Sequence, residues 1–298
     1  MSRTSLALTL LILTSLAPAQ DAVSHPFICS DNGQGKVFVI DAEGQTTWEY
    51  DLANSQDVWL LPNGNYLLSY NRGAIEITVD KEIVWQYESP EGTEVHTCQP
   101  LPDGRVMVIE CGSKRIVEID PDGEIAKTVR LHPNHDNVHG HFRNGRKLAN
   151  GNYLVSFVGE NKLVEVDGDG HVVKEFPTPG NVFGGIRLPN GNTLAGCGDG
   201  HKIVEFDPEG NIVWQIDEND LPGNPLRFVA GLQRLPNGNT VVCNWGGHGH
   251  IDGQPVIFEV TRDKQVVWQI DDYERFQCVS NVMLLDIPGD ATQGEILR

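Results

Sequence analysis

The fold is predicted by the stretch Leu61-Pro62-Asn63-Gly64-Asn65, the first of five copies of one motif. The other copies are Leu101-Pro102-Asp103-Gly104, Leu148-Ala149-Asn150-Gly151-Asn152, Leu188-Pro189-Asn190-Gly191-Asn192 and Leu235-Pro236-Asn237-Gly238-Asn239. Their leucines are 40, 47, 40 and 47 residues apart. Each copy predicts a tight hairpin turn, in which Pro fixes φ and Asn-Gly or Asp-Gly supplies the positive-φ positions. An apolar run follows each turn, and a turn and strand at this period are typical of a propeller blade.

The residues around each turn predict a unit of four strands. In the first complete unit these strands cover 58–61, 66–70, 74–79 and 83–87. The same pattern recurs over 95–131, 142–176, 182–216 and 228–270, and helical periodicity is absent throughout. We therefore predict five complete blades between residues 58 and 270.

The two ends of the chain each hold part of a further unit. Residues 27–50 supply three strands without a first one, whereas 278–290 contain Val282-Met283-Leu284-Leu285, which matches Val58-Trp59-Leu60-Leu61. Pairing of the ends would complete a sixth blade and hide both sheet edges. We predict an all-β fold: a six-bladed β-propeller of four-stranded antiparallel blades, closed by a blade shared between the N- and C-termini. An open solenoid is the alternative, but it would need polar capping repeats.

The first 19 residues have the pattern of a secretory signal peptide. Arg3 precedes an apolar run, and Ala17-Pro18-Ala19 provides a small-residue cleavage site. A buried N-terminal helix is the alternative, whereas the run is too short for a membrane span. We predict a signal peptide over 1–19, a linker over 20–26 and the propeller over 27–298. The expected location is therefore periplasmic or extracellular.

Charge and cysteine content exclude several kinds of function. The net charge is −19 and no basic run offsets it, so we expect no binding to nucleic acid or anionic lipid. Export would permit disulfides, but most of the six cysteines lie in strand-like runs, where a buried thiol is the ordinary explanation. No CxxC or CxxCH motif occurs among them, which argues against a zinc ribbon or c-type haem. The cysteines are Cys29, Cys98, Cys111, Cys197, Cys243 and Cys278.

A tryptophan recurs in the predicted fourth strands. The sequence Asp207-Pro208-Glu209-Gly210-Asn211-Ile212-Val213-Trp214 has a near copy ending at Trp48, and Trp85 and Trp268 hold the same position. This pattern resembles the tryptophan-docking repeat of PQQ-type quinoprotein propellers, in which the indole packs between blades. Lys127 and Lys174 replace the tryptophan in two blades, which predicts incomplete docking there.

The whole unit also looks like the repeats of secreted bacterial PQQ-like proteins of unassigned function. The quinoprotein dehydrogenases have more blades and a vicinal cysteine pair beneath the quinone. No Cys-Cys occurs in this chain, so we do not expect PQQ as a cofactor. A further similarity, carried by Gln56-Asp57-Val58 and His96-Thr97, is to bacterial arylsulfotransferases, six-bladed propellers whose channel histidines and arginines handle a sulfuryl group.

The histidines are predicted to gather on one face of the ring. Because antiparallel strands alternate in direction, the LPNG turns and the Asp-x-x-Gly turns share one face, which we call the turn face. Connections between blades, and loops joining second to third strands, share the opposite face, which we call the loop face. Eight of the ten histidines map to the loop face or its strand ends: His96, His132, His135, His139, His141, His201, His248 and His250. Because loops on a rigid scaffold carry most function, we predict the site on this face.

Three chemical roles fit these residues. A divalent metal would be held by imidazoles and a carboxylate, and its predicted ligands are His135, His139, His141, His248, His250 and Asp252. A transferase or hydrolase would use histidine as base or nucleophile with arginines for an anionic group, and its predicted residues are His96, His139, His141, Arg143 and Arg187. Asp57, Arg234 and His201 are predicted ligand contacts. A structural hydrogen-bonding role stays open for each single histidine.

The sequence thus predicts an exported propeller that binds a small-molecule or extended ligand on the histidine-rich face. A non-catalytic binding module is the first hypothesis. The second is an enzyme, which requires the histidines and arginines to converge in one pocket at the channel mouth. The third is a protein-interaction scaffold, which requires an exposed apolar patch on that face. The ligand, the metal and the oligomeric state are not predicted.

Overall fold

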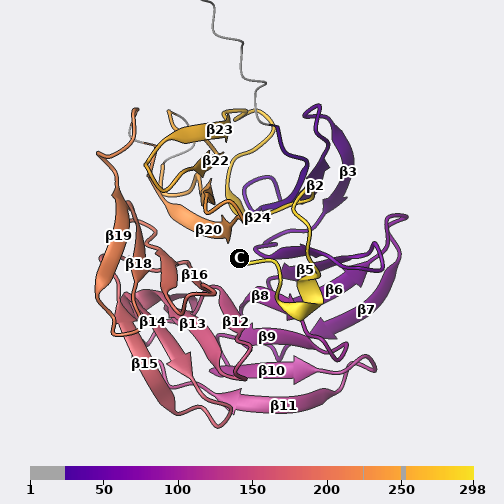
Figure 1. Cartoon of the computed structure of the whole chain (residues 1–298). Coiled ribbons are helices and arrows are strands. Elements are labelled where there is room, and N and C mark those ends of the chain that lie inside the picture. The colour runs from indigo at the N-terminus through magenta and orange to yellow at the C-terminus, as the bar shows by residue number, and fades with distance from the viewer. Residues whose placement is uncertain (1–23, 224, 250–252) are drawn as a thin grey trace, which may run out of the picture.

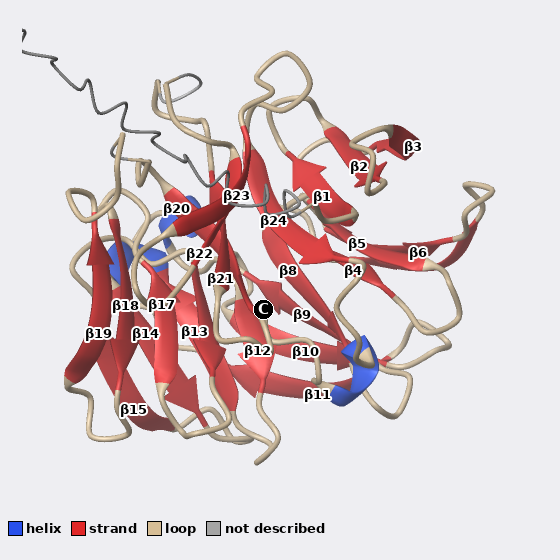
Figure 2. Ribbon diagram, turned by 45° about the horizontal axis from the view of Figure 1, so that its top comes forward, coloured by secondary structure: helices blue, strands red, loops and turns tan. Residues whose placement is uncertain are grey.

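Six four-stranded antiparallel sheets surround a central axis in the computed structural model of the chain (Figure 1). The structure describes residues 24–223, 225–249 and 253–298, so the predicted signal peptide lies outside the described residues. Short 3-10 helices are the only helical elements in the described ranges (Figure 2). Within those ranges, no helix has the length and apolar character needed to cross a bilayer. The predicted fold is confirmed.

Each blade runs from an inner strand at the axis to an outer strand at the rim. In that order, blade 1 holds β24 (Val279–Leu284), β1 (Phe27–Asp31), β2 (Lys36–Ile40) and β3 (Thr46–Asp51). Blade 2 holds β4 (Val58–Leu60), β5 (Tyr66–Tyr70), β6 (Gly73–Ile77) and β7 (Ile83–Glu88). Blade 3 holds β8 (Val95–Pro100), β9 (Val106–Glu110), β10 (Arg115–Ile119) and β11 (Ile125–Arg130).

The second half of the ring repeats this order. Blade 4 holds β12 (Gly145–Lys147), β13 (Tyr153–Phe157), β14 (Lys162–Val166) and β15 (Val172–Pro177). Blade 5 holds β16 (Gly184–Arg187), β17 (Thr193–Gly196), β18 (Lys202–Phe206) and β19 (Ile212–Asp217). Blade 6 holds β20 (Val229–Arg234), β21 (Thr240–Asn244), β22 (Ile257–Val260) and β23 (Val266–Ile270). The 3-10 helices are η1 (Val138–Gly140), η2 (Val158–Glu160) and η3 (Ala291–Gln293).

Blade 1 closes the ring with strands from both ends of the chain. β24 pairs antiparallel with β1, with Phe27 opposite Leu284 and Cys29 opposite Val282. Figure 1 shows the late strand β24 beside the early strands of this blade. The pairing satisfies the backbone groups that would otherwise form two open sheet edges. The predicted shared blade is thereby confirmed.

The LPNG turns differ in one detail from the prediction. In the first turn the Gly64 N–H donates to the Leu61 carbonyl, and Gly64 has φ of 85°. Asn63 is absent from the described residues with positive φ, and its Oδ1 instead accepts the Asn65 N–H at 3.0 Å. Only the glycine is therefore left-handed, which is typical of a three-residue hairpin with a glycine bulge.

The second asparagine of the motif binds a glutamate of the third strand. Its side-chain amide donates to the carboxylate in four blades: Asn65 to Glu76 at 2.6 Å, Asn152 to Glu165 at 2.7 Å, Asn192 to Glu205 at 2.7 Å and Asn239 to Glu259 at 2.6 Å. In blade 3, Arg105 takes the place of this asparagine and pairs with Glu118 at 2.8 Å. The motif thus ties each turn to its own sheet.

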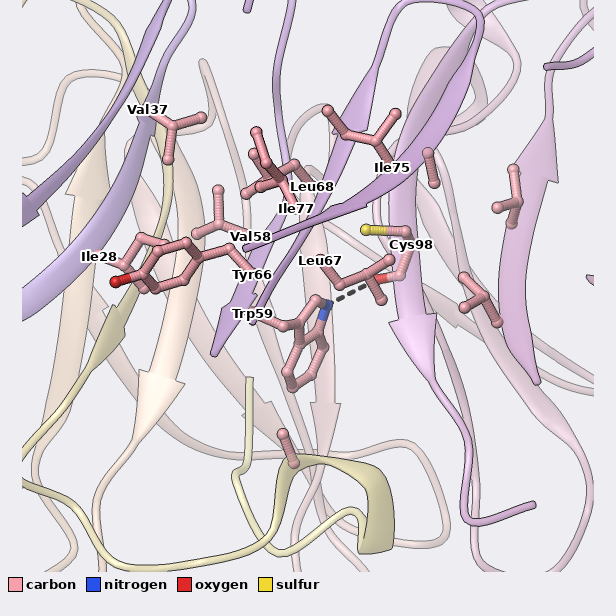
Figure 3. Packing of buried hydrophobic residues seen from close by; sticks show 14 of the residues in the cluster. Ile28, Val37, Val58, Trp59, Tyr66, Leu67, Leu68, Ile75, Ile77 and Cys98 are labelled. Carbon is pink, nitrogen blue, oxygen red and sulfur yellow. Dashed lines mark hydrogen bonds between the residues drawn. The ribbon is translucent and has the colours of Figure 1, made fainter. Parts of the chain in front are cut away.

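Blades pack against each other through apolar faces. Trp59 on β4 is 1% exposed, and its Nε1 donates to the Cys98 carbonyl of β8 at 2.7 Å (Figure 3). Val58 and Leu67 lie in the same buried cluster. Burying each such side chain contributes about 1.5–3 kcal/mol, so the interfaces between blades form the core.

Tryptophan docking between blades is present, and it extends to lysine. The indole N–H of Trp85 on β7 donates to the Asp120 carbonyl of blade 3 at 3.2 Å. At the equivalent position, the Lys174 ammonium donates to the Pro208 carbonyl of blade 5. Blade 4 therefore lacks the docked indole, as predicted, but its lysine still forms a hydrogen bond to the turn of the next blade.

Candidate functional site

A pocket of about 320 Å³ lies on the loop face. Its volume falls in the usual range for small-molecule sites. All of its walls come from connections between blades and from loops joining second to third strands, as the alternation of strand direction predicts. The lining residues are Asn32, Gln56, His139, Gly140, Arg143, Val158, Gly159, Asn161, Asn181, Phe183, Phe228, Trp245 and His248.

One wall of the pocket is aromatic. Phe228 packs edge-on against Phe183, Trp245 and His248, with ring centroids 6.3, 5.1 and 5.5 Å apart. The ring of Trp245 lies so close to Gly247 that a Cβ there would fall 1.9 Å from it. The local sequence therefore fixes the position of the indole, and the wall offers flat apolar surface to a ligand.

The repeat determines which residues reach the pocket from the inner strands. The position five residues before each turn leucine, or before Leu285 in blade 1, lies at the loop-face end of the inner strand. These six residues are Gln56, His96, Arg143, Phe183, Ala230 and Ser280. Gln56, Arg143 and Phe183 line the pocket. Gln56 and Phe183 were not among the predicted site residues, although the register of the LPNG repeat identifies both.

Gln56 lines the pocket and carries a buried hydrogen-bond acceptor without a partner among the described residues. The side chain is 8% exposed, and its Oε1 has no partner among the described residues. Buried polar atoms in proteins are nearly always hydrogen-bonded. The wall also contains one arginine, Arg143, and no carboxylate. It therefore favours a ligand with a hydrogen-bond donor and a neutral or anionic character.

His139 lies between a carboxylate and a guanidinium. Its Nδ1 is 2.8 Å from Oε2 of Glu94, and its Nε2 is 2.8 Å from Nη2 of Arg143. Arg143 is held in place by donating from Nη1 to the His139 carbonyl at 2.7 Å. Burial lowers the pKa of Arg143. The structure thus brings two of the predicted catalytic residues together and adds Glu94, which was not among the predicted residues.

His96 approaches the same carboxylate from the inner strand β8. Its Nε2 is 3.1 Å from Oε2 of Glu94, and its ring meets that of His139 edge-on at 5.8 Å. Burial, together with the positive charge of Arg143, lowers the pKa of His96 to about 4. The hydrogen bond with His96, reinforced by one with His139, lowers the pKa of Glu94 to about 2 despite partial burial. A neutral imidazole beside an ionised carboxylate is an arrangement that can accept a proton or a metal ion.

His141 and His135 occupy structural positions. The ring nitrogens of His141 lie 2.8 Å from the Cys111 carbonyl and 2.8 Å from the His135 carbonyl. The His135 ring packs against Gly140 and Gly159, where an added Cβ would clash with it. Of the predicted metal ligands that the structure describes, only His139 lies in a cluster of at least three residues whose potential ligand atoms are within 4.8 Å of one another.

The remaining loop-face predictions divide into three outcomes. His248 lines the pocket, and its Nδ1 lies 3.3 Å from Asp199. His201 closes the turn after β17 with φ of 52° and does not line the pocket. His250 and Asp252 lie outside the described residues.

Arg187 and Arg234 lie on the turn face, so the predicted convergence with the histidines is wrong for both. Each is the last residue of its inner strand. Arg187 donates to Glu165 at 2.7 Å, and Arg234 lies 3.5 Å from Glu205. Both neutralise third-strand glutamates. The error arises from the direction of the inner strand, because its first residue lies at the loop face and its last residue lies at the turn face.

Asp57 is fully buried and holds the centre of the ring together. Arg146 donates to its Oδ2 at 2.8 Å, and Arg298 donates to its Oδ1 at 3.1 Å. Thr97 of blade 3 donates to Oδ2 at 2.9 Å. Figure 1 shows the last residues of the chain running into the middle of the ring. The carboxylate is thus satisfied by protein groups and does not line the loop-face pocket, so the structure does not support the predicted ligand contact.

Two larger hollows lie on the turn face beside the final segment. Their volumes are about 610 and 670 Å³, and residues 296 and 297 line both. In the second hollow, Arg262 donates to Glu205 at 2.6 Å, and Arg234 lies beside the same carboxylate. Buried polar atoms without a partner among the described residues also line these hollows, namely Nε2 of Gln233, Nε of Arg234 and Nε of Arg298.

Comparison with protein families identifies the chain. The model of the Mal s 1 allergenic protein-like family matches residues 34–265. The chain belongs to this family. These comparisons support the propeller architecture, but they do not confirm the expected resemblance to PQQ-like and arylsulfotransferase propellers. No curated protein sequence matches the chain significantly.

Solved structures support the same architecture. A protein of unknown function from Bacteroides caccae is 31% identical, with a TM-score of 0.82, over 89% of this chain and 100% of its own. A streptogramin B lyase is 14% identical, with a TM-score of 0.60, over 86% of this chain and 85% of its own. A catalytically inactive virginiamycin B lyase from Staphylococcus aureus, solved with quinupristin, is 17% identical, with a TM-score of 0.56, over 85% and 86%. The likeness to the two lyases shows the fold alone.

Proposed function

We propose that this protein is a binding module for a small molecule with a ring-containing apolar body and a polar or anionic group. The observation that carries the proposal is the loop-face pocket, which is lined both by aromatic side chains and by Gln56, Arg143 and His139. Stacking against Phe183, Phe228 and Trp245 would hold the apolar body. A rotation of the Gln56 side chain would turn its buried, unsatisfied Oε1 toward the ligand, where it would accept an N–H or O–H.

Arg143 selects the charge of the ligand in this proposal. The chain as a whole carries −19, yet the pocket lining contains one guanidinium and no carboxylate. The general field of the protein repels anions, so the local positive charge must act at short range, within a partly dehydrated pocket. An aromatic carboxylate matches both the flat wall and the cation.

Saturation-transfer NMR tests the binding proposal. The probes are benzoate, phenylpropionate and indole-3-acetate, each with its neutral amide as a partner. Transfer from the protein to the aromatic protons is expected in the wild type, and a loss of signal is expected in Phe183→Ala. Val213→Ala, an exposed side chain on β19, is the matched control and should leave the signal unchanged. Absence of transfer to every probe, or equal transfer in Phe183→Ala, would refute the proposal.

A second candidate function is an enzyme of the transferase or hydrolase type. It is favoured by one observation: His139 is held at the pocket wall between Glu94 and Arg143. A carboxylate that fixes the tautomer of a histidine is a frequent arrangement for general-base chemistry. Two fold neighbours carry the name lyase, one of them a catalytically inactive form, but they share the fold alone.

The enzymatic candidate is tested with 4-nitrophenyl sulfate plus a phenol acceptor and with 4-nitrophenyl acetate. Release of nitrophenolate by the wild type, lost in His139→Ala and retained in His135→Ala, would support it. Equal rates in the wild type and His139→Ala would exclude a role for this histidine in the reaction.

The scaffold function receives less support from the described surface. Its large exposed apolar side chains include Val84, Val173 and Val213, on the outer strands β7, β15 and β19. These lie at the rim of the ring rather than on the loop face, where the scaffold hypothesis requires them. A protein partner would therefore bind through the rim.

We also propose that the protein is exported, on the basis of the pattern in residues 1–19. The intact mass of the full chain recovered from the periplasm of a Gram-negative host tests this. A mature chain that begins at Gln20 is expected. Retention of residues 1–19 in the cytoplasm would contradict export.

A further inference from the structure

Three donors from two neighbouring segments meet beside the pocket. Glu94 and His96 lie on either side of Val95 at the start of β8, so an extended backbone points them the same way. His139 lies in η1, on the connection from blade 3 to blade 4. One ligand atom from each of these residues lies within 4.8 Å of the others. Both imidazoles approach the same carboxylate oxygen, at 3.1 and 2.8 Å.

We propose that Glu94, His96 and His139 form a binding site for a divalent transition metal, with zinc as the reference ion. Two imidazoles and one carboxylate are a donor set that proteins use for zinc with an open coordination position, and for iron(II) in the facial triad. In a tetrahedral site with bonds of about 2.1 Å, ligand atoms are roughly 3.4 Å apart. The distances from Oε2 of Glu94 to the two imidazole nitrogens are 3.1 and 2.8 Å. Both are close to this value, so small side-chain rotations would make room for the ion. The inference is independent of the organic ligand proposed above.

One imidazole of the site is buried and the other is exposed to solvent. His96 is 4% exposed, and its Nδ1 is buried without a partner among the described residues. A buried imidazole whose one polar contact is Glu94 is not accounted for by a purely structural role. The side chain of His139 is 62% exposed and lines the pocket. An ion can therefore reach the site from solvent, and its open position would face the pocket.

Arg143 limits the affinity of the site. Its Nη2 lies 2.8 Å from Nε2 of His139. A histidine that binds metal through Nδ1 carries its proton on Nε2, which cannot then accept a hydrogen bond from the guanidinium. The guanidinium must turn away and also repels the cation. We therefore expect tighter metal binding in Arg143→Gln, because the glutamine oxygen can accept the Nε2 proton.

A second cluster serves as an internal control. Asp167, Asp169 and His171 also place ligand atoms within 4.8 Å of one another. Oδ1 of Asp167 accepts the backbone N–H groups of Asp169 and His171, both at 2.9 Å, which is ordinary turn chemistry. Asp169 and His171 are exposed, Asp167 is half-buried, and the cluster lies on the turn face, so it carries no proposal.

The test is titration of the chelator-treated full chain with ZnCl₂ by calorimetry, followed by Co²⁺ absorption spectroscopy. One equivalent of metal is expected to bind to the wild type. Glu94→Gln and His139→Ala should each lower the affinity at least tenfold, and the visible Co²⁺ bands should disappear in both. Arg143→Gln should raise the affinity. His171→Ala and His135→Ala should bind as the wild type does, and thermal unfolding checks that each variant is folded.

Three results would overturn the proposal. The first is absence of saturable binding to the wild type. The second is unchanged affinity in both Glu94→Gln and His139→Ala. The third is loss of binding in His171→Ala, which would assign the metal to the turn-face cluster. Phe183→Ala should keep the metal while losing the aromatic probes, so failure of the metal site and failure of the ligand pocket are distinguishable.

Discussion

Nδ1 of His139 lies 2.8 Å from Oε2 of Glu94, although 45 residues separate them in the sequence. The connection from blade 3 to blade 4 folds back over the start of β8, and this return brings the imidazole to the carboxylate. Nη2 of Arg143 contacts the other ring nitrogen of His139, Nε2, at 2.8 Å. The polar end of the loop-face pocket is therefore built across the boundary between two blades.

The buried ion cluster on Asp57 provides a stability prediction. Asp57→Asn leaves Arg146 and Arg298 without the carboxylate that both contact, and loss of one partner from a buried pair costs about 3–5 kcal/mol. When Arg298→Met is added to Asp57→Asn, the free energy of unfolding should recover by at least about 1 kcal/mol, because one uncompensated charge is removed.

Urea denaturation of the single and double variants measures this coupling. Asp263→Asn, an exposed turn residue, removes the same charge and should change the free energy of unfolding by less than about 0.5 kcal/mol. If the effects of Asp57→Asn and Arg298→Met simply add, the cluster is not coupled as described.

The buried glutamates of the third strands predict that the free energy of unfolding depends on pH. Burial alone would raise the pKa of Glu205, but hydrogen bonds from Asn192 and Arg262 outweigh it and lower the pKa below 4.5. A lowered carboxylate pKa in the folded state contributes stability above the unfolded value, near pH 4.5, and that contribution is lost as the pH falls through the folded pKa. Glu205→Gln should therefore cost about 3 kcal/mol at pH 7 and much less at pH 3.

Equilibrium unfolding at pH 7, 5, 4 and 3 measures the difference. Glu209→Gln is the matched control, because Glu209 is an exposed residue in the turn that follows the same strand. Its effect should be small at every pH. A cost for Glu205→Gln that does not change between pH 7 and pH 3 would contradict the ion-pair account.

The cysteines predict that a reductant does not change the stability of the protein. All six lie among the described residues and none forms a disulfide. Burial raises the pKa of the Cys111 thiol to about 12 and that of Cys278 to about 11. The folded protein should therefore react slowly with Ellman's reagent at pH 8, and the unfolded, unreduced protein should release six equivalents. Dithiothreitol should leave the melting temperature unchanged, whereas fewer than six thiols after unfolding would indicate a disulfide.

The architecture could be predicted from the sequence because its signals are local and repeated. The Leu61 turn and its copies set the register, and the incomplete ends at Phe27 and Leu284 determined ring closure. The hydrogen bond from Lys174 to the next blade was not predicted, because the residue type alone does not show that a lysine can bridge two blades.

The candidate site was predicted only in part, for geometric reasons. His139 and Arg143 were identified because they lie in a histidine-rich connection, whereas Glu94 was missed although it lies two residues before the predicted His96. Arg187 was placed on the wrong face because its position within the strand was not counted from the turn. Counting five residues back from each turn leucine would have identified Gln56 and Phe183 and excluded Arg187.

The measurement that tests the central claim most directly is a crystal structure of the protein soaked with the aromatic carboxylates. It asks which face of the ring binds the ligand, because larger hollows lie on the turn face. The prediction is electron density for an aromatic ring against Phe183, Phe228 and Trp245, with its carboxylate directed to Arg143. Ligands found only in the turn-face hollows beside residues 296 and 297, with the loop-face pocket filled by solvent, would contradict it.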